Sequence, residues 1–248
     1  MATRTLYLVR HGYYDLTSPH KLGGSLTSIG VEQAQLTAQR FSSLPITAIH
    51  CSTLPRAAET ADIIAQELTD TPLHRSRGLQ ERVPCIPPAW TEYFKGYSPK
   101  IIARDKKQAE KAFEKYFKRA QGKDKHEILV GHGNLIRYFI CRVLQVQPEG
   151  WGNMDMCNCG VSEVLIRPDG QMVLVSHNDV SHLPHRLVTS LVGPRLSRTL
   201  YRLAQIALDQ GDLVEARKRG HESLTISKRG KYQDAAQVEA WLDGLPPE

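Results

Sequence analysis

Near its N-terminus the chain reads Thr5-Leu6-Tyr7-Leu8-Val9-Arg10-His11-Gly12. The first five of these residues are β-prone and mostly apolar. A short run of this kind that ends in polar residues and glycine is typical of a buried strand leading into a loop. After a polar stretch, Thr27 precedes a helical pattern of apolar residues and is a candidate N-cap. We therefore predict a strand-loop-helix unit with Arg10 and His11 at the carboxyl end of its strand.

The same alternation of strand and helix returns twice along the chain. Residues 46–51 predict a second strand and residues 56–68 a helix with one apolar side. Residues 128–131 predict a third strand, followed by a helix over 135–144. This order favours a mostly parallel sheet with helices on both faces, a three-layer α/β/α fold, in which ligands bind at the carboxyl ends of the strands. The polar residues near those ends are Arg10, His11, Arg56 and His132.

Residues 82–100 interrupt this alternation, because their four prolines disfavour regular structure. A packing helix is expected from about residue 105 to residue 120. Residues 161–167 and 171–176 flank the turn sequence Pro168-Asp169-Gly170 and predict a hairpin at an antiparallel edge of the sheet. The aromatic side chains of the interrupting segment form either a lid over the substrate or the hydrophobic underside of a long insertion. They are Trp90, Tyr93, Phe94 and Tyr97.

The α/β domain is predicted to span residues 1–190, and Gly193-Pro194 marks a break before a helical extension over 195–248. Small residues between about 197 and 230 resemble one 34-residue tetratricopeptide repeat, and a further helical stretch follows over 235–242. A single repeat needs a neighbour to bury its apolar face. We therefore expect the extension to pack on the α/β domain, on a second copy of the chain in a homodimer, or on another protein.

Composition and charge narrow the class of ligand. The 248 residues include 32 Lys and Arg against 26 Asp and Glu, a formal net charge of +6, which favours acidic ligands. The basic residues are spread along the chain, and neither an RNA-binding aromatic signature nor zinc-finger spacing accompanies them. We expect a phosphorylated substrate, either a protein or a small molecule, and no nucleic acid.

Cysteine usage and hydropathy bear on the compartment. Five cysteines, one of them necessarily left over from pairing, do not resemble the disulfide framework of a secreted protein and favour a reducing cytoplasm. The apolar run Leu6–Val9 is too short for a signal-peptide core. No stretch approaches the roughly 20 apolar residues that span a bilayer. We predict a cytoplasmic protein that has no cleaved leader and does not associate with a membrane.

An arginine-histidine-glycine triplet is common, so residues 10–12 alone indicate little. The chain also contains Leu-Thr-Ser-Ile-Gly-Val-Glu-Gln-Ala, Cys-Ser-Thr-Leu-Pro-Arg-Ala-Ala-Glu-Thr, Leu-Gln-Glu and Gly-His-Gly, in this order. Together these segments resemble the diagnostic motifs of the histidine phosphatase superfamily, which includes the phosphoglycerate mutases. The resemblance extends over residues 5 to about 190. The four segments are residues 26–34, 51–60, 79–81 and 131–133.

Within that superfamily, three further segments are similar to the branch of mitochondrial serine/threonine protein phosphatases. They are residues 132–138, residues 148–151, and Asn158-Cys159-Gly160 leading into residues 164–170. The resemblance implies a metal-independent phosphatase that hydrolyses phosphomonoesters through a phosphohistidine intermediate, on phosphoserine, phosphothreonine or phosphohistidine of proteins.

Phosphoryl transfer needs an in-line nucleophile, positive charge around the non-bridging oxygens, and a proton for the leaving group. A neutral imidazole is nucleophilic near pH 7, so His11 can attack phosphorus directly. Arg10 and Arg56 supply donor forks for the phosphate, and His132, if protonated, adds a third positive partner. Because these cations take the place that magnesium has in many other enzymes, no metal or other cofactor is expected.

Two assignments depend on the resemblance more than on local sequence. Glu81 would be the general acid and then the base that activates water, although with Gln80 and Arg82 beside it, it is also consistent with a solvated carboxylate. Asn134 is a candidate to bind the phosphate or to cap the helix that starts there, and the two roles are not exclusive. Many superfamily members carry a glutamate or glutamine just after the triplet, where this chain has Tyr13-Tyr14. The alternatives are a phosphoglycerate mutase-type phosphotransferase, and a scaffold that binds a partner through its helical tail.

Overall fold

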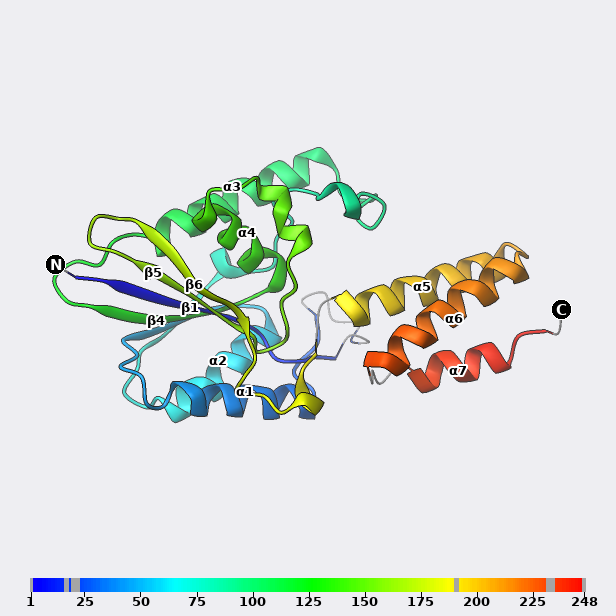
Figure 1. Cartoon of the computed structure of the whole chain (residues 1–248), viewed down its shortest axis with the longest axis horizontal. Helices are drawn as coiled ribbons and strands as arrows, with labels where there is room; N and C mark the ends of the chain where they lie inside the picture. The colour runs from blue at the N-terminus through cyan, green and yellow to red at the C-terminus, as the bar shows by residue number, and fades with distance from the viewer. Residues whose placement is uncertain (1, 16–17, 19–22, 190–191, 231–234, 247–248) are drawn as a thin grey trace. The chain divides into compact units, whose positions relative to one another are not determined.

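The computed structural model of the chain describes residues 2–15, 18, 23–189, 192–230 and 235–246. The chain forms two compact units, Met1–Val188 and Thr189–Glu248. In Figure 1 the first unit is a sheet with helices on both faces, and the second consists of helices. The predicted fold class, a three-layer α/β/α domain with an additional helical segment, is confirmed. That residues 1–190 and 195–248 are separate domains stays a prediction.

The first unit is built on a six-stranded sheet with the strand order β3-β2-β4-β1-β5-β6. β1, β2, β3 and β4 pair in parallel, whereas β5 runs antiparallel to both β1 and β6. The sheet is therefore mostly parallel with an antiparallel hairpin at one edge, as the sequence predicts. The strands are β1 (Arg4–Arg10), β2 (Ala48–Ser52), β3 (Leu73–Ser76), β4 (Lys125–Gly131), β5 (Val161–Ile166) and β6 (Met172–Asp179).

Helices α1 and α2 cover one face of the sheet, and α3 and α4 cover the other (Figure 1). On one face, α1 and α2 pack their alanines and Phe41 against Tyr7 and Val9 of β1. Because the strand is covered on both faces, all seven residues of β1 are buried, which explains the apolar run Leu6–Val9 within it. The helices are α1 (Ser28–Phe41), α2 (Pro55–Glu67), α3 (Pro99–Tyr116) and α4 (Gly133–Leu144).

The register of the sheet brings three strand ends to one edge. Arg10 pairs with Gly131 across β1 and β4, and Cys51 pairs with Val130 across β2 and β4. The residues that follow these strands therefore leave the sheet side by side. His11 follows β1, and His132 follows β4.

Helix ends follow local capping chemistry. The Thr27 hydroxyl accepts a hydrogen bond from the backbone N–H of Gly30 at 3.3 Å, so the predicted N-cap of α1 is confirmed. α3 starts at Pro99, ahead of the predicted start near residue 105, because Ser98 caps it and proline is favourable in the first turn of a helix. β3 was not predicted. It is a four-residue strand at the edge of the sheet, and its residues are partly or fully exposed, so they form no clear apolar pattern.

Short 3₁₀ helices connect the longer elements of the first unit. η2 begins the aromatic segment, in which the rings of Trp90 and Phe94 lie 5.9 and 6.2 Å from that of Trp151 in η3. Tyr93 and Tyr97 are instead 47% and 42% exposed. The segment therefore has a hydrophobic underside, with two tyrosines facing solvent. The 3₁₀ helices are η1 (Arg77–Leu79), η2 (Pro88–Trp90), η3 (Pro148–Asn153) and η4 (His185–Leu187).

The second unit contains α5 (Val192–Asp209), α6 (Leu213–Gly230) and α7 (Ala235–Asp243). Its apolar cluster joins Val238 and Leu242 of α7 to side chains of α5 and α6. The helical character of this part is as predicted, whereas its assignment to the tetratricopeptide repeat stays a prediction. Among the described residues, no helix has both the length and the apolar character required to cross a membrane.

Candidate active site

His11 is fixed at the carboxyl end of β1 by its backbone and its ring. Its N–H donates to the Gly131 carbonyl at 3.0 Å, and its carbonyl accepts from the Asn158 amide at 2.9 Å. The ring is buried, and its Nδ1 lies 2.8 Å from the carbonyl oxygen of Gly12. A carbonyl oxygen can only accept, so Nδ1 carries the proton. The lone pair of the imidazole is therefore on Nε2.

Arg56 connects this lone pair to a second histidine. It lies in the first turn of α2, where Pro55 starts the helix after β2. Its Nε is 3.1 Å from His11 Nε2, and its Nη2 is 3.2 Å from His132 Nδ1. A guanidinium group can only donate, so both imidazole nitrogens must be acceptors. His132 therefore carries its proton on Nε2, which donates to the Ser52 hydroxyl at 2.8 Å.

The surroundings keep both histidines neutral. Burial lowers the pKa of His11 well below its ordinary value, and the positive charges of Arg56 and Arg10 and the neighbouring His132 lower this pKa further. Burial also lowers the pKa of His132 well below its ordinary value, with Arg56, Arg10 and Arg82 acting in the same direction. Neutral His11 is the nucleophilic form. A protonated His132 is disfavoured unless a bound anion offsets these charges.

Arg10 is held by the loop that leads into β5. Its side chain is buried, and its Nη1 donates to the Met156 carbonyl at 2.7 Å. Its backbone pairs with the same loop, since its carbonyl accepts from the Cys159 N–H at 2.9 Å. Arg10 directly precedes His11, and its positive charge lowers the pKa of both histidines.

Asn134 lies in the first turn of α4 and is buried. Its Oδ1 accepts a hydrogen bond from Arg137 Nη2 at 2.9 Å, and Arg137 also donates to the carbonyls of Gly133 and Met154. Because the oxygen is bound in this way, the amide can offer only its NH₂ group to an anion. The positive end of the α4 dipole is at the same place.

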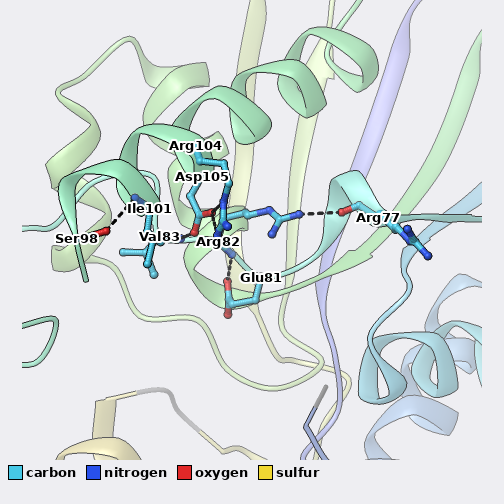
Figure 2. A network of polar contacts seen from close by, with 8 residues as sticks. All are labelled: Arg77, Glu81, Arg82, Val83, Ser98, Ile101, Arg104 and Asp105. Atoms are coloured by element: carbon cyan, nitrogen blue, oxygen red, sulfur yellow. Dashed lines mark hydrogen bonds and ion pairs between the residues drawn. The ribbon is translucent and has the colours of Figure 1, made fainter. Parts of the chain in front are cut away.

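Glu81 is held at the same edge of the sheet by its neighbours. Gln80 donates to the Thr53 hydroxyl just beyond β2 at 2.8 Å, and the Val83 N–H donates to the buried carboxylate of Asp105 in α3 at 3.1 Å. Figure 2 shows the Glu81 carboxylate on the opposite side of the backbone from Asp105, accepting from the Arg82 N–H at 3.3 Å. Among the described residues, it makes no hydrogen bond to His11, Arg56 or His132, which are joined directly.

Sequence reasoning missed three residues that support this arrangement. The Thr60 hydroxyl accepts from the Gly12 N–H at 3.0 Å and donates to the Arg56 carbonyl at 2.7 Å, so it ties the His11 loop to α2. Its position four residues after Arg56 was an available signal. Tyr14 presents its ring to His11 at 5.1 Å in an edge-on contact, and the Arg56 guanidinium lies 4.6 Å above the same ring. No sequence signal separated Ser52 from other serines.

Sequence comparison identifies the class of protein to which this site belongs. The sequence profile of the histidine phosphatase superfamily (branch 1) matches residues 6–83 and 98–180. The chain belongs to this superfamily.

Individual relatives have names that state a narrower activity than the superfamily does. The "Serine/threonine-protein phosphatase Pgam5, mitochondrial" of Caenorhabditis elegans is 39% identical over 189 residues, which cover 74% of this chain and 65% of that protein. Its Homo sapiens counterpart is 34% identical over 193 residues, 76% of this chain and 66% of the relative. This chain thus spans about two thirds of their length. A solved phosphoserine phosphatase from Entamoeba histolytica, in complex with 3-phosphoglyceric acid, is 25% identical with a TM-score of 0.57, over 73% of this chain and 100% of that one.

The predicted cytoplasmic location is wrong by this comparison, because both relatives are named as mitochondrial. All five cysteines are free, and this agrees with any reducing compartment and does not single out the cytoplasm. Net charge and hydropathy do not distinguish one compartment from another.

Proposed function

We propose that this protein is a phosphatase that hydrolyses phosphomonoesters through a phosphohistidine formed at Nε2 of His11. The observation that supports this most directly is the fixed tautomer. The Gly12 carbonyl holds the proton on Nδ1, and Arg56 contacts the lone pair on Nε2. The nitrogen that has to attack phosphorus is therefore the one that faces the phosphate-binding arginine.

In the first half of the reaction, Nε2 of His11 attacks phosphorus as the bond from phosphorus to the ester oxygen breaks. Glu81, in its protonated form, gives its proton to the departing oxygen. The imidazole becomes positively charged, and its Nδ1–H bond to the Gly12 carbonyl stabilises that charge. Arg10, Arg56 and the NH₂ group of Asn134 bind the three non-bridging oxygens.

In the second half, water attacks the phosphohistidine. The Glu81 carboxylate takes one proton from this water as its oxygen bonds to phosphorus, and the bond from phosphorus to Nε2 breaks. His11 regains its lone pair and inorganic phosphate leaves. His132 donates to the phosphate when the anion's charge favours its protonated form.

The names of the relatives support a protein substrate, with phosphoserine or phosphothreonine as the group that is hydrolysed. Phosphohistidine in proteins is the alternative. A phosphatase and a phosphoglycerate mutase share the histidine chemistry, so the two activities need a direct comparison. Incubation with 3-phosphoglycerate and a trace of the bisphosphate is expected to give no robust isomerisation, and rapid isomerisation would contradict the phosphatase proposal.

The nucleophile is tested with His11→Ala. This variant is expected to lose turnover of p-nitrophenyl phosphate and of phosphopeptides while its circular dichroism is unchanged. Acid-labile, base-stable label from a ³²P-phosphopeptide is expected on the wild-type protein in a rapid quench, and none on the variant. Unchanged turnover by His11→Ala would refute the assignment.

We also propose that residues 195–248 form a tetratricopeptide-like extension of a catalytic domain over residues 1–190, and that it mediates homodimerisation. Its support is an apolar surface, since Leu203, Ile206 and Val214 are 43%, 50% and 74% exposed. Leu203→Ser with Ile206→Ser is expected to shift the mass measured by light scattering from dimer to monomer. A monomeric wild-type protein at all concentrations would contradict this role.

A further inference from the structure

A pocket of about 350 Å³ lies between η1 and α3, outside the group of residues assigned above to phosphoryl transfer. We call it the cationic pocket. Its wall contains no acidic residue, and four of its nine lining residues are positively charged. The polar side chains that line it are Ser76, Arg77, Arg82, Gln108, Lys111 and Lys115.

Carboxylates offset the charge of these four cations only in part, since Asp105 and Glu81 act on Arg82 from outside the wall. Among the residues that the structure describes, no carboxylate lies within 4.0 Å of the charged group of Arg77, Arg82, Lys111 or Lys115. Like charges around one concave wall repel one another, and an anion between them converts this repulsion into attraction. The wall is therefore complementary to a negatively charged group.

Arg82 is the only one of the four that is not exposed to solvent. Its guanidinium makes one hydrogen bond in the described structure, from Nη2 to the Arg77 carbonyl at 3.3 Å (Figure 2), and its Nε is buried without a partner. A buried donor without an acceptor is costly. Burial also lowers the pKa of Arg82, as expected for a charge that has lost solvation. Gln108 adds a buried Oε1 that has no partner in the described structure, and rotation of this amide would present its NH₂ group.

The cationic pocket is next to the catalytic edge of the sheet. Arg82 directly follows Glu81, and its charge is close enough to lower the pKa of His132. An extended peptide advances roughly 3.3 Å per residue. A peptide whose phosphorylated residue is at His11 can therefore extend toward Arg82, which lies one residue beyond Glu81.

We propose that the cationic pocket binds a second anionic side chain of the phosphopeptide substrate, a phosphate in preference to a carboxylate. This inference rests on the proposed phosphatase function and specifies its substrate class: peptides that are phosphorylated or acidic near the site of hydrolysis. Phosphate is preferred because it carries more charge than a carboxylate and presents three acceptor oxygens to the four cations.

The test compares three series of phosphoserine peptides that differ in one flanking residue, which is phosphothreonine, glutamate or alanine at successive offsets on either side. Only phosphoserine hydrolysis is counted, by mass spectrometry. At the matching offset, wild-type protein is expected to hydrolyse the phosphothreonine peptide with a kcat/KM about threefold to tenfold above the alanine peptide. The glutamate peptide is expected to fall between them. The difference should lie in KM and should shrink as salt is raised.

Lys111→Gln with Lys115→Gln removes two exposed cations from the cationic pocket and is expected to abolish this preference. Lys106→Gln with Lys107→Gln is the matched control, because it removes the same charge from exposed positions of α3 that do not line the pocket. The control is expected to keep the wild-type preference. Loss of the preference in both double variants would indicate a general charge effect and overturn the proposal.

The wild-type result separates the two proposals. If wild-type protein hydrolyses the alanine peptide without preferring a second phosphate at any offset, the cationic pocket is not a substrate site, and the phosphatase function stands. If it hydrolyses no peptide in any series, the proposed function on phosphopeptides and the inference that rests on it are both overturned.

Discussion

Arg56 Nε donates to the lone pair of His11 Nε2 across 3.1 Å. This hydrogen bond holds the imidazole in the tautomer that can attack phosphorus, but it also occupies the attacking lone pair. Attack therefore requires the arginine to give up the bond. A phosphate oxygen is a stronger acceptor for a guanidinium than a neutral imidazole is, because both partners are then charged. Substrate binding and release of the nucleophile are thus expected to occur in the same event.

Arg56→Lys tests this coupling. Lysine keeps the charge but lacks the planar fork that contacts His11 and His132 together. We expect kcat/KM for a phosphopeptide to fall about 100-fold to 1,000-fold, in the range for the loss of one transition-state donor. Arg75→Lys is the control, since Arg75 is an exposed arginine that pairs with Asp62 on the surface. Equal activity in the two variants would contradict a direct role for Arg56.

Glu81→Gln distinguishes a general acid from a solvated carboxylate. A general acid matters most when the leaving oxygen is a poor leaving group, so the loss should depend on the ester. We expect kcat/KM, which reports the steps up to departure of the leaving group, to fall about 100-fold to 10,000-fold for phosphoserine peptides, and far less for p-nitrophenyl phosphate, whose phenolate leaves without a proton. The ratio of the two losses is the measurement. A loss that is the same for both esters would assign another role to Glu81.

Asp105→Asn tests whether α3 positions Glu81. The Asp105 carboxylate is buried and accepts from the Val83 N–H, two residues beyond Glu81, while the Arg104 side chain contacts its other oxygen (Figure 2). The neutral amide is a weaker acceptor for both donors. We expect kcat for phosphoserine peptides to fall about tenfold with KM nearly unchanged. In the Glu81→Gln background the same change should add little, because the two residues act through one proton transfer. Full additivity would mean that Asp105 acts independently of Glu81.

The sequence was sufficient for the parts of the fold that depend on one strong local pattern. The apolar run of β1, the Thr27 cap and the alanine-rich face of α2 each have a clear periodicity, and their alternation leads to a parallel sheet. β3 lacked such a pattern because it is at the sheet edge, where only one neighbour constrains it. The start of α3 was missed because Pro99 suggested a break, although proline in a first turn favours a helix.

The candidate site also contains residues whose position the sequence could predict and features that it could not. Residues that follow a strand directly, such as His11 and His132, could be placed at one edge from topology alone. The tautomers of the two histidines could not be predicted, because they depend on which atoms face each other across segments that are far apart in the sequence. Arg82 shows the same limit. In the sequence it is only a neighbour of Glu81, and its place in the cationic pocket depends on how α3 packs on η1.

The pH dependence of the free energy of unfolding tests the lowered pKa of the two buried histidines, and it does not depend on turnover. The pKa of both His11 and His132 is lowered well below 6.5 in the folded protein, mainly by burial. Between that lowered value and 6.5 the unfolded chain binds more protons than the folded one, so the free energy of unfolding rises with pH. It is therefore expected to fall as pH drops below 6.5, by at most about 1.4 kcal/mol per pH unit for each histidine.

Urea unfolding at a series of pH values between 5 and 8 measures this slope. His132→Asn removes one of the two protons involved, so its free energy of unfolding is expected to depend less steeply on pH than that of the wild-type protein, whatever the change in absolute stability. His185→Asn is the control because His185 is exposed. Half-buried histidines, such as His50 and His182, whose pKa values burial lowers to about 4, contribute equally to all three proteins and cancel in the comparison. A slope in His132→Asn that equals the wild-type slope would mean that folding does not lower the pKa of His132, and it would contradict the neutral form assigned to this residue.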